Sequence, residues 1–210
     1  MSETKTRDRM AELARSLHQR GYGVGSSGNI SCKLDDGILV TPTNSCMGFL
    51  DPEQISKVDF EGNHVSGGKP SKEAFLHLEM YRSRPQDTSV VHLHSTYSVA
   101  ASCLKNTDPN NVLPPITAYY VMKVGQLKLI PYYAPGDQTL AQAVGIAAKE
   151  TSSVLLANHG PVIAGKTLES AVYAAEELEE TAKLYFILEG RETSYLNAAQ
   201  IADLNTRFPS

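Results

Sequence analysis

Two histidines, His92 and His94, flank Leu93 in a β-branched, apolar stretch of the sequence. Alternate side chains of a β-strand point to the same face, so both imidazoles would share one face, about 7 Å apart along the backbone. Leu93 would point the other way, into a core. Two such imidazoles can bind one divalent ion at about 2.0–2.1 Å. Taken alone, the motif is equally compatible with one core histidine and one surface histidine.

A third histidine, His159, follows the apolar residues 152–157 and precedes Gly160. It therefore lies at a predicted strand end, where open α/β sheets place ligand sites. Three histidines around one ion, with a fourth position left open, are typical of catalytic zinc. Asn158-His159-Gly160 is also an ordinary turn sequence. The three histidines together nevertheless favour a metal site.

A carboxylate near the middle of the chain adds a group that could move protons. Glu73 begins a predicted helix, where a carboxylate either only favours the helix dipole or serves as a general acid and base beside the metal. His77 follows one helical turn later on the same face and is placed to hydrogen-bond Glu73. His77, His18 and His64 are interpreted as structural residues.

Three short loops carry the hydroxyl, amide and backbone N–H groups that commonly bind phosphate. They contain Gly28 and Asn29, Thr43 and Asn44, and Ser71 and Lys72. Lys72 adds a positive charge to the third loop. Each loop by itself is also compatible with ordinary turn chemistry.

The elements that must position these residues alternate along the chain. Apolar residues at helical spacing predict helices over 6–20, 72–82 (with Ser71 as N-cap), 96–104, 138–149 and 167–189. Apolar runs predict strands over 38–41, 88–93, 126–131 and 152–157. Residues 24–31 are interpreted as a turn entering a strand, 51–55 as a helical turn and 62–68 as a glycine-rich loop. The alternation predicts one α/β domain over residues 1–210, with helices on both faces of a sheet.

The composition excludes several classes of protein. The 210 residues are 41% hydrophobic and 20% charged, with a formal net charge of −4. A disordered chain would contain fewer apolar residues, and a nucleic-acid or anionic-membrane binder usually has a basic surplus. No apolar run approaches the roughly 20 residues that span a bilayer, and residues 1–9 show no signal-peptide pattern. Three scattered cysteines predict a reducing, cytoplasmic location.

Taken in order, the motifs resemble those of the class II aldolase/adducin family. The motifs are Gly28-Asn29-x-Ser31, Thr41-Pro42-Thr43, Pro70-Ser71-x-Glu73, His92-x-His94 and Asn158-His159-Gly160. The resemblance implies a three-layer α/β/α sandwich with a largely antiparallel central sheet. It also implies a four-fold symmetric homotetramer with active sites at the subunit interfaces.

The resemblance also implies a role for each matching residue. It assigns His92, His94 and His159 to one zinc ion per subunit, with other divalent metals as alternatives, and Glu73 to acid–base catalysis. It assigns the phosphate pocket to Gly28, Asn29, Thr43, Asn44, Ser71 and Lys72. Tyr119 is identified as the proton donor to a neighbouring subunit's site, and Tyr120, beside it, is the alternative.

Two residues distinguish branches of this family. The fuculose-phosphate aldolase pattern has Gly at position 44 and Ser at position 72, where this chain has Asn44 and Lys72. The sequence is more similar to the branch that decarboxylates 3-oxo-tetronate 4-phosphates, which belongs to four-carbon sugar-acid breakdown. That branch implies conversion to dihydroxyacetone phosphate and CO2 through a metal-stabilised enediolate.

Two other functions remain alternatives at this point. One is a class II aldolase that cleaves a ketose 1-phosphate, because the metal and phosphate machinery would be the same. The other is a non-enzymatic, adducin-like binding module, which would not need the histidines or Glu73. The threonate and erythronate series of substrates are not separated by the sequence.

Overall fold

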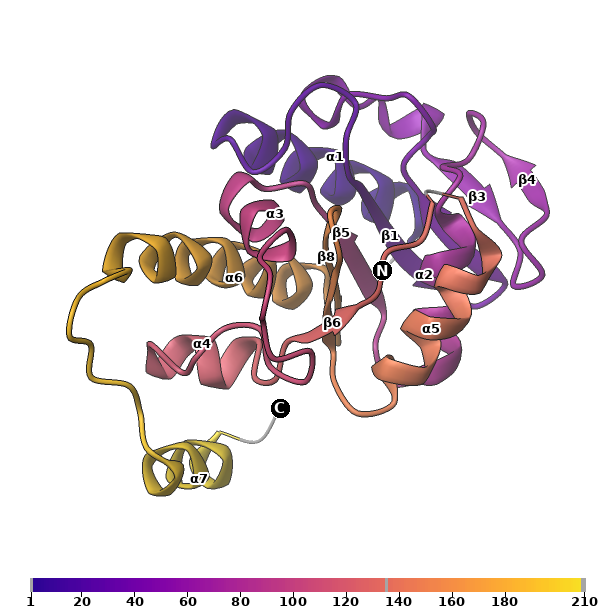
Figure 1. Ribbon diagram of the computed structural model, residues 1–210. Coiled ribbons are helices and arrows are strands. Elements are labelled where there is room, and N and C mark those ends of the chain that lie inside the picture. Colours follow the sequence, from indigo (N-terminus) through magenta and orange to yellow (C-terminus); the bar gives the residue numbers. More distant parts are fainter. Residues whose placement is uncertain (1, 135, 209–210) are drawn as a thin grey trace.

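A sheet of eight strands forms the central layer of the protein (Figure 1). The computed structural model describes residues 2–134 and 136–208. The strand order is β4-β3-β2-β1-β5-β8-β7-β6, and every neighbouring pair is antiparallel except β6 and β7. The strands are β1 (Asn29–Leu34), β2 (Gly37–Val40), β3 (Ser56–Val58), β4 (His64–Ser66), β5 (Ser89–His92), β6 (Lys128–Ile130), β7 (Ser153–Leu156) and β8 (Gly160–Gly165).

Helices cover both faces of this sheet, which confirms the predicted three-layer α/β/α arrangement. Helices α2 and α5 lie on one face, and α1, α3 and α6 lie on the other (Figure 1). The helices are α1 (Glu3–Gln19), α2 (Ala74–Ser83), α3 (Thr96–Ser102), α4 (Ala118–Lys123), α5 (Gln138–Ala148), α6 (Leu168–Leu188) and α7 (Ala198–Arg207), with 3-10 turns at Met47–Phe49 and Pro52–Gln54. Within the described residues, no helix has the length and apolar character needed to cross a membrane.

Each face of the sheet has its own hydrophobic core. Successive residues of a strand point to opposite faces, so Val90 packs under α2 and α5 while Val91 packs under α1 and α6. In β8 the same alternation separates Val162 from Ile163. Because β5 and β8 are buried on both faces, their central residues, Val90 and Val91 in β5 and Val162 and Ile163 in β8, are apolar. The central strands of the sheet therefore contribute to both cores.

The structure contains elements that the sequence patterns did not predict. Strand β8 begins with Gly160-Pro161, residues that favour turns and are depleted inside strands. Strand β4 lies within residues 62–68, so the interpretation of this segment as a loop is wrong. Helix α2 begins at Ala74 rather than at residue 72, so Ser71 is not its N-cap; its Oγ instead accepts a hydrogen bond from the Glu73 backbone N–H at 3.2 Å. Helices α4 and α7 were also not predicted.

Candidate functional site

The predicted site residues collect at one edge of the sheet. In an antiparallel sheet, the start of one strand and the end of its neighbour lie at the same edge. Asn29, the first residue of β1, therefore pairs with His92, the last residue of β5. His159 lies in the three-residue turn that joins β7 to β8 at this same edge. Residues that are 63 to 130 positions apart in the sequence are brought together in this way.

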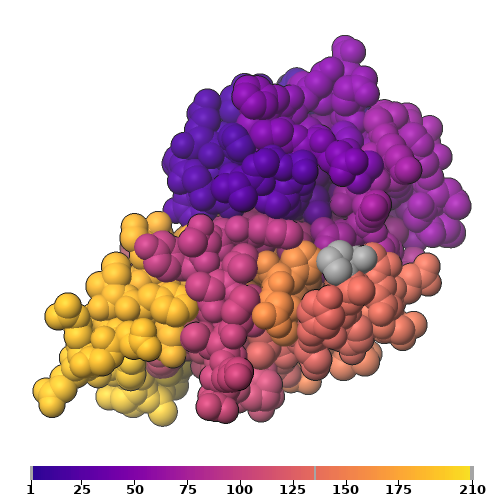
Figure 2. Space-filling model, turned by 45° about the horizontal axis from the view of Figure 1, so that its top comes forward, coloured from indigo at the N-terminus to yellow at the C-terminus, as the bar shows by residue number. Residues whose placement is uncertain are grey.

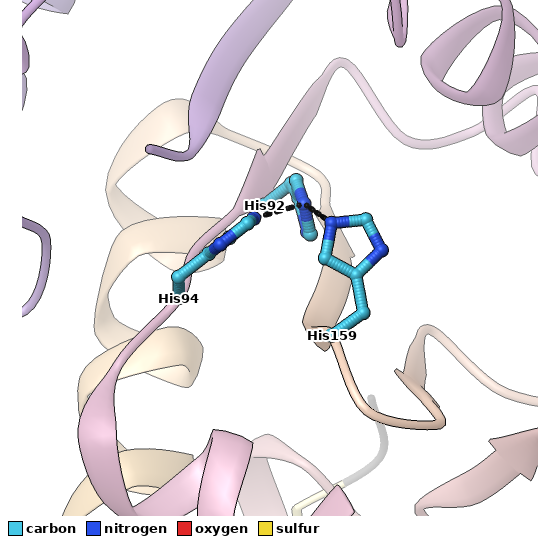
Figure 3. A group of neighbouring side chains, drawn as sticks. All are labelled: His92, His94 and His159. Atoms are coloured by element: carbon cyan, nitrogen blue, oxygen red, sulfur yellow. Dashed lines mark hydrogen bonds between the residues drawn. The ribbon is translucent and has the colours of Figure 1, made fainter. Parts of the chain in front are cut away.

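The side chains of His92, His94 and His159 point toward one another (Figure 3). The Nε2 atom of His92 lies 3.0 Å from that of His94 and 3.3 Å from that of His159. One detail of the prediction is wrong: β5 ends at His92, so His94 lies just beyond the strand. Leu93 points into the core, as expected, and is 1% exposed.

The three imidazoles fit a divalent metal ion. Tetrahedral ligands at about 2.0–2.1 Å from an ion are about 3.3 Å apart, close to the spacing of these Nε2 atoms. His92 donates from Nδ1 to the Pro161 carbonyl at 2.8 Å, which leaves its Nε2 lone pair directed at the cluster. Burial, with a contribution from the charge of His92, lowers the pKa values of His94 and His159 to about 4. Both are therefore neutral at pH 7, the form that binds metals.

Glu73 places a carboxylate beside the three histidines. Its Oε2 lies 3.5 Å from the Nε2 of His92, and its Oε1 lies 3.4 Å from the Nε2 of His159. Burial raises the pKa of Glu73, but the charge of His92 and a hydrogen bond from Asn29 outweigh this effect and hold the pKa below its usual value. Glu73 is therefore an ionised carboxylate within reach of a ligand on the metal. The predicted hydrogen bond to His77 is wrong, because His77 contacts Asn29 instead.

Two motif glycines allow the site loops to lie against the backbone of β5. Gly28 has a φ of +79°, which favours glycine, and a Cβ there would lie 2.8 Å from the His92 carbonyl oxygen. A Cβ on Gly160 would lie 2.3 Å from the Leu93 carbonyl oxygen. The glycines that precede Asn29 and follow His159 are thus required by close backbone packing.

The three loops of the predicted phosphate pocket lie next to one another. Thr41 exchanges hydrogen bonds with Ile30, directly after Gly28 and Asn29. Pro42 pairs with Pro70, and the Thr43 N–H donates to the Lys69 carbonyl at 2.9 Å. These contacts bring Thr43 and Asn44 beside Ser71 and Lys72. Ser71 is half-buried, whereas Asn44 and Lys72 are exposed.

In the space-filling view, residues up to about 90 lie on one side of the molecule and the later segments on the other (Figure 2).

Two adjacent tyrosines of α4 have opposite environments. Tyr120 is 1% exposed within the core, and burial raises its pKa above the usual value. Tyr119 is 62% exposed and hydrogen-bonds to none of the three histidines within the described part of this chain. Of the two candidates, Tyr119 is therefore the one whose phenol can reach another molecule.

A cavity of about 540 Å³ lies beside the histidines and contains residues that the sequence patterns did not single out. It is lined by His94, Thr96, Val99, Tyr132, Tyr133, Asn158 and His159. The two tyrosines follow β6, and β6 is parallel to β7, so both strands end at this edge. The predicted strand over residues 126–131 would have placed Tyr132 and Tyr133 at this edge if the direction of that strand in the sheet had been known.

A larger hollow, about 800 Å³, lies at the opposite edge of the sheet. Five of its charged side chains are paired with one another: Arg9 with Glu169, and Lys57 with Glu3 and Asp36. It contains none of the histidines. The chemistry of the molecule is therefore centred on the smaller cavity.

A buried carboxylate, Glu179 of α6, fixes the segment that carries His94. It accepts hydrogen bonds from the backbone N–H groups of Tyr97 and Ser98 and from the Ser98 hydroxyl, at 2.6–2.8 Å. Helix α3 begins at Thr96, so Glu179 holds the helix start two residues after His94. The acidic run over 176–180 had given no sign of this contact.

Replacing Glu179 with alanine is expected to lower the free energy of unfolding by about 3 kcal/mol, because buried N–H donors lose their acceptor. Urea unfolding followed by circular dichroism measures the loss. Glu180→Ala is the matched control, because Glu180 is exposed and surface substitutions change stability by about 0.5 kcal/mol or less. Equal losses in the two variants would contradict the capping role.

Known proteins are similar to this chain over most of its length. Residues 8–186 match the family described as "Class II Aldolase and Adducin N-terminal domain". The 3-oxo-tetronate 4-phosphate decarboxylase of Escherichia coli K12 is 51% identical over 205 residues, 97% of each chain. The L-fuculose phosphate aldolase of Methanocaldococcus jannaschii is 38% identical over 82% of this chain and 91% of its own.

A solved structure supports the same relationship. The crystal structure of YgbL from Escherichia coli superposes with a TM-score of 0.94 at 50% identity, covering 96% of this chain and 98% of that one. The chain therefore belongs to the class II aldolase/adducin family.

Proposed function

We propose that this chain is a metal-dependent decarboxylase that converts a 3-oxo-tetronate 4-phosphate to dihydroxyacetone phosphate and CO2. The observation that carries the proposal is the convergence of three Nε2 atoms and one carboxylate beside three polar loops. Relatives named for this reaction share about half of their residues with the chain over nearly its full length. We expect one domain over residues 1–210.

The proposed roles follow from the chemistry of each side chain. His92, His94 and His159 would hold one zinc ion, or another divalent ion, through Nε2. A divalent ion in this position supplies a Lewis acid for negative charge that develops on substrate oxygens. Glu73, an ionised carboxylate 3.4–3.5 Å from two of these Nε2 atoms, would hold the proton of the substrate's C2 hydroxyl.

The reaction requires one bond to break and one proton to be delivered. The C1–C2 bond breaks and CO2 leaves. The electron pair of that bond moves to C2 and the C3 oxygen. A proton added to C2 then gives dihydroxyacetone phosphate. Tyr119, exposed on α4, is the proposed donor, supplied by a neighbouring subunit. Tyr120 is too buried to serve.

The substrate's anionic groups would be held by the three loops. Gly28, Asn29, Thr43, Asn44, Ser71 and Lys72 would surround the phosphate. A substrate with both a phosphate and a carboxylate carries more negative charge than a ketose 1-phosphate. The exposed cation of Lys72 suits such a substrate. Holding the phosphate fixes the orientation of the C1–C2 bond.

The proposed assembly is a homotetramer with active sites between subunits. Exposed aromatic side chains on α4 and α6, including Tyr119 and Tyr173, support a subunit interface formed by these two helices. Helix α7 packs on α4 but buries none of its own residues fully. The three cysteines are free, which suits the proposed cytoplasmic location.

A class II aldolase acting on a ketose 1-phosphate is the second candidate. It is favoured by the relatives named L-fuculose phosphate aldolase, which are 36–38% identical to this chain. The same histidines, carboxylate and loops would serve that reaction. A non-enzymatic binding module is disfavoured, because it would have no use for three converging imidazoles.

The test is to incubate zinc-loaded protein with 3-oxo-tetronate 4-phosphate and measure CO2 and dihydroxyacetone phosphate together. Both series of C2 stereochemistry are assayed, with correction for spontaneous loss of CO2. Equal amounts of the two products, abolished by a chelator, are expected. No CO2 above the background rate would refute the decarboxylase. Release of an aldehyde from ketose 1-phosphates would then identify the aldolase.

A further inference from the structure

A chain of hydrogen bonds leads from Glu73 into the core between β1 and α2. Asn29 Nδ2 lies 2.7 Å from Glu73 Oε2, and His77 Nε2 lies 2.5 Å from Asn29 Oδ1. Ser31 Oγ lies 2.7 Å from His77 Nδ1 and 2.7 Å from the Tyr81 hydroxyl. Asn29, Ser31, His77 and Tyr81 are each at most 4% exposed.

The periods of the two elements produce this alignment. Asn29 and Ser31 are two residues apart on β1, so they point to the same face of the sheet. His77 and Tyr81 are four residues apart on α2, so they lie on one helix face. The polar row of the strand therefore faces the polar row of the helix, inside an otherwise apolar layer.

The amide of Asn29 fixes the direction of the hydrogen bonds in the chain. Its Nδ2 donates to Glu73 Oε2, and its Oδ1 can only accept from the Nε2 of His77. His77 must then carry its proton on Nε2. Burial lowers the pKa of His77 to about 3, so the ring is neutral and Nδ1 is an acceptor.

The remaining two bonds follow from the tautomer of His77. Since Nδ1 accepts, the Ser31 hydroxyl must donate to it, and the Tyr81 hydroxyl must then donate to Ser31. Burial raises the pKa of Tyr81 well above its usual value, so the phenol keeps its proton. All four bonds therefore run in one direction and end on Glu73.

We propose that His77 is a positioning residue that acts through Asn29 on Glu73, with Ser31 and Tyr81 fixing its tautomer. The role assigned to His77 rests on the proposed function of Glu73 as the acid and base. His77 prevents the Asn29 amide from turning its oxygen toward the carboxylate. Both ends of the Asn29 side chain are engaged in this chain.

Two substitutions of His77 separate positioning from simple packing. The amide nitrogen of His77→Gln can replace Nε2 and donate to Asn29. The shorter His77→Asn can only replace Nδ1, so Asn29 loses its donor. We expect kcat for decarboxylation to fall about tenfold in His77→Asn, the effect of one lost hydrogen bond, and to change by less than about threefold in His77→Gln. KM and zinc affinity should be unchanged in both variants.

Equal kcat values in the two variants would overturn the proposal, since packing alone does not distinguish the two amides. A loss confined to KM would also overturn it, because it would place Asn29 and His77 in substrate binding.

A second measurement requires neither substrate nor substitution. Long-range ¹H–¹⁵N correlations in the ¹⁵N-labelled wild-type protein report which nitrogen of His77 carries the proton. A neutral ring protonated on Nε2 is expected between about pH 6 and pH 8. A proton on Nδ1, or a charged ring, would overturn the proposal. A wild-type protein that releases no CO2 would instead refute the proposed function, and the tautomer would still decide the direction of the chain.

Discussion

Replacing His94 with alanine is expected to abolish zinc binding and decarboxylation while leaving the fold intact. Two imidazoles remain in this variant, and zinc affinity should fall by more than about 100-fold. Without the bound ion, kcat/KM should fall by about 1,000-fold or more. His94 lies beyond the end of β5 and is partly exposed, so its loss leaves neither core with a cavity. Isothermal titration with zinc and the CO2 assay measure the two effects.

The control for this variant is His64→Ala. His64 is exposed on β4, an edge strand of the sheet, and two strands separate β4 from β1, the nearest strand that carries a site residue. The His64→Ala variant should bind zinc and convert the substrate like the wild type. A His94→Ala protein that unfolds, while the chelated wild type also unfolds, would contradict a catalytic ion and identify a structural one. A His94→Ala protein with full activity would remove the histidine cluster from the mechanism.

The constellation of the three histidines could be predicted from the sequence because each follows from a local rule. The two-residue spacing predicted that His92 and His94 share one side, although His94 lies beyond the end of β5, and the end of an apolar run placed His159 at the sheet edge. In the structure, the Nε2 atom of His92 lies 3.0 Å from that of His94 and 3.3 Å from that of His159. The layers of the fold followed equally from the alternation of helix and strand patterns.

The contacts around the cluster could not be predicted, because they depend on strand order and helix packing. Tyr132 and Tyr133 reach the cavity only because β6 is parallel to β7. Glu179 lies among four glutamates over 176–180, and only its position against α3 distinguishes it from the exposed Glu180. His77 was placed near Glu73 by helical spacing, yet Asn29 lies between them.

A second large loss of activity is expected when Glu73 is replaced by glutamine. The variant keeps the volume of the side chain but cannot take up a proton at neutral pH. Loss of a general acid and base typically costs about 100- to 10,000-fold in rate, so kcat should fall within that range. Zinc affinity should remain within about tenfold of wild type, since the three imidazoles are unchanged.

Glu79→Gln is the matched control for this prediction, because Glu79 lies on α2, the helix that Glu73 caps, and pairs with Arg82 on the surface. Its kcat should equal that of the wild type. The two outcomes for Glu73→Gln have different meanings. A fall in kcat with zinc retained assigns proton transfer to the carboxylate. A fall in zinc affinity that accounts for all the lost activity would contradict that role, because Glu73 would then act only as a ligand, as its 3.4–3.5 Å distance to two Nε2 atoms also permits.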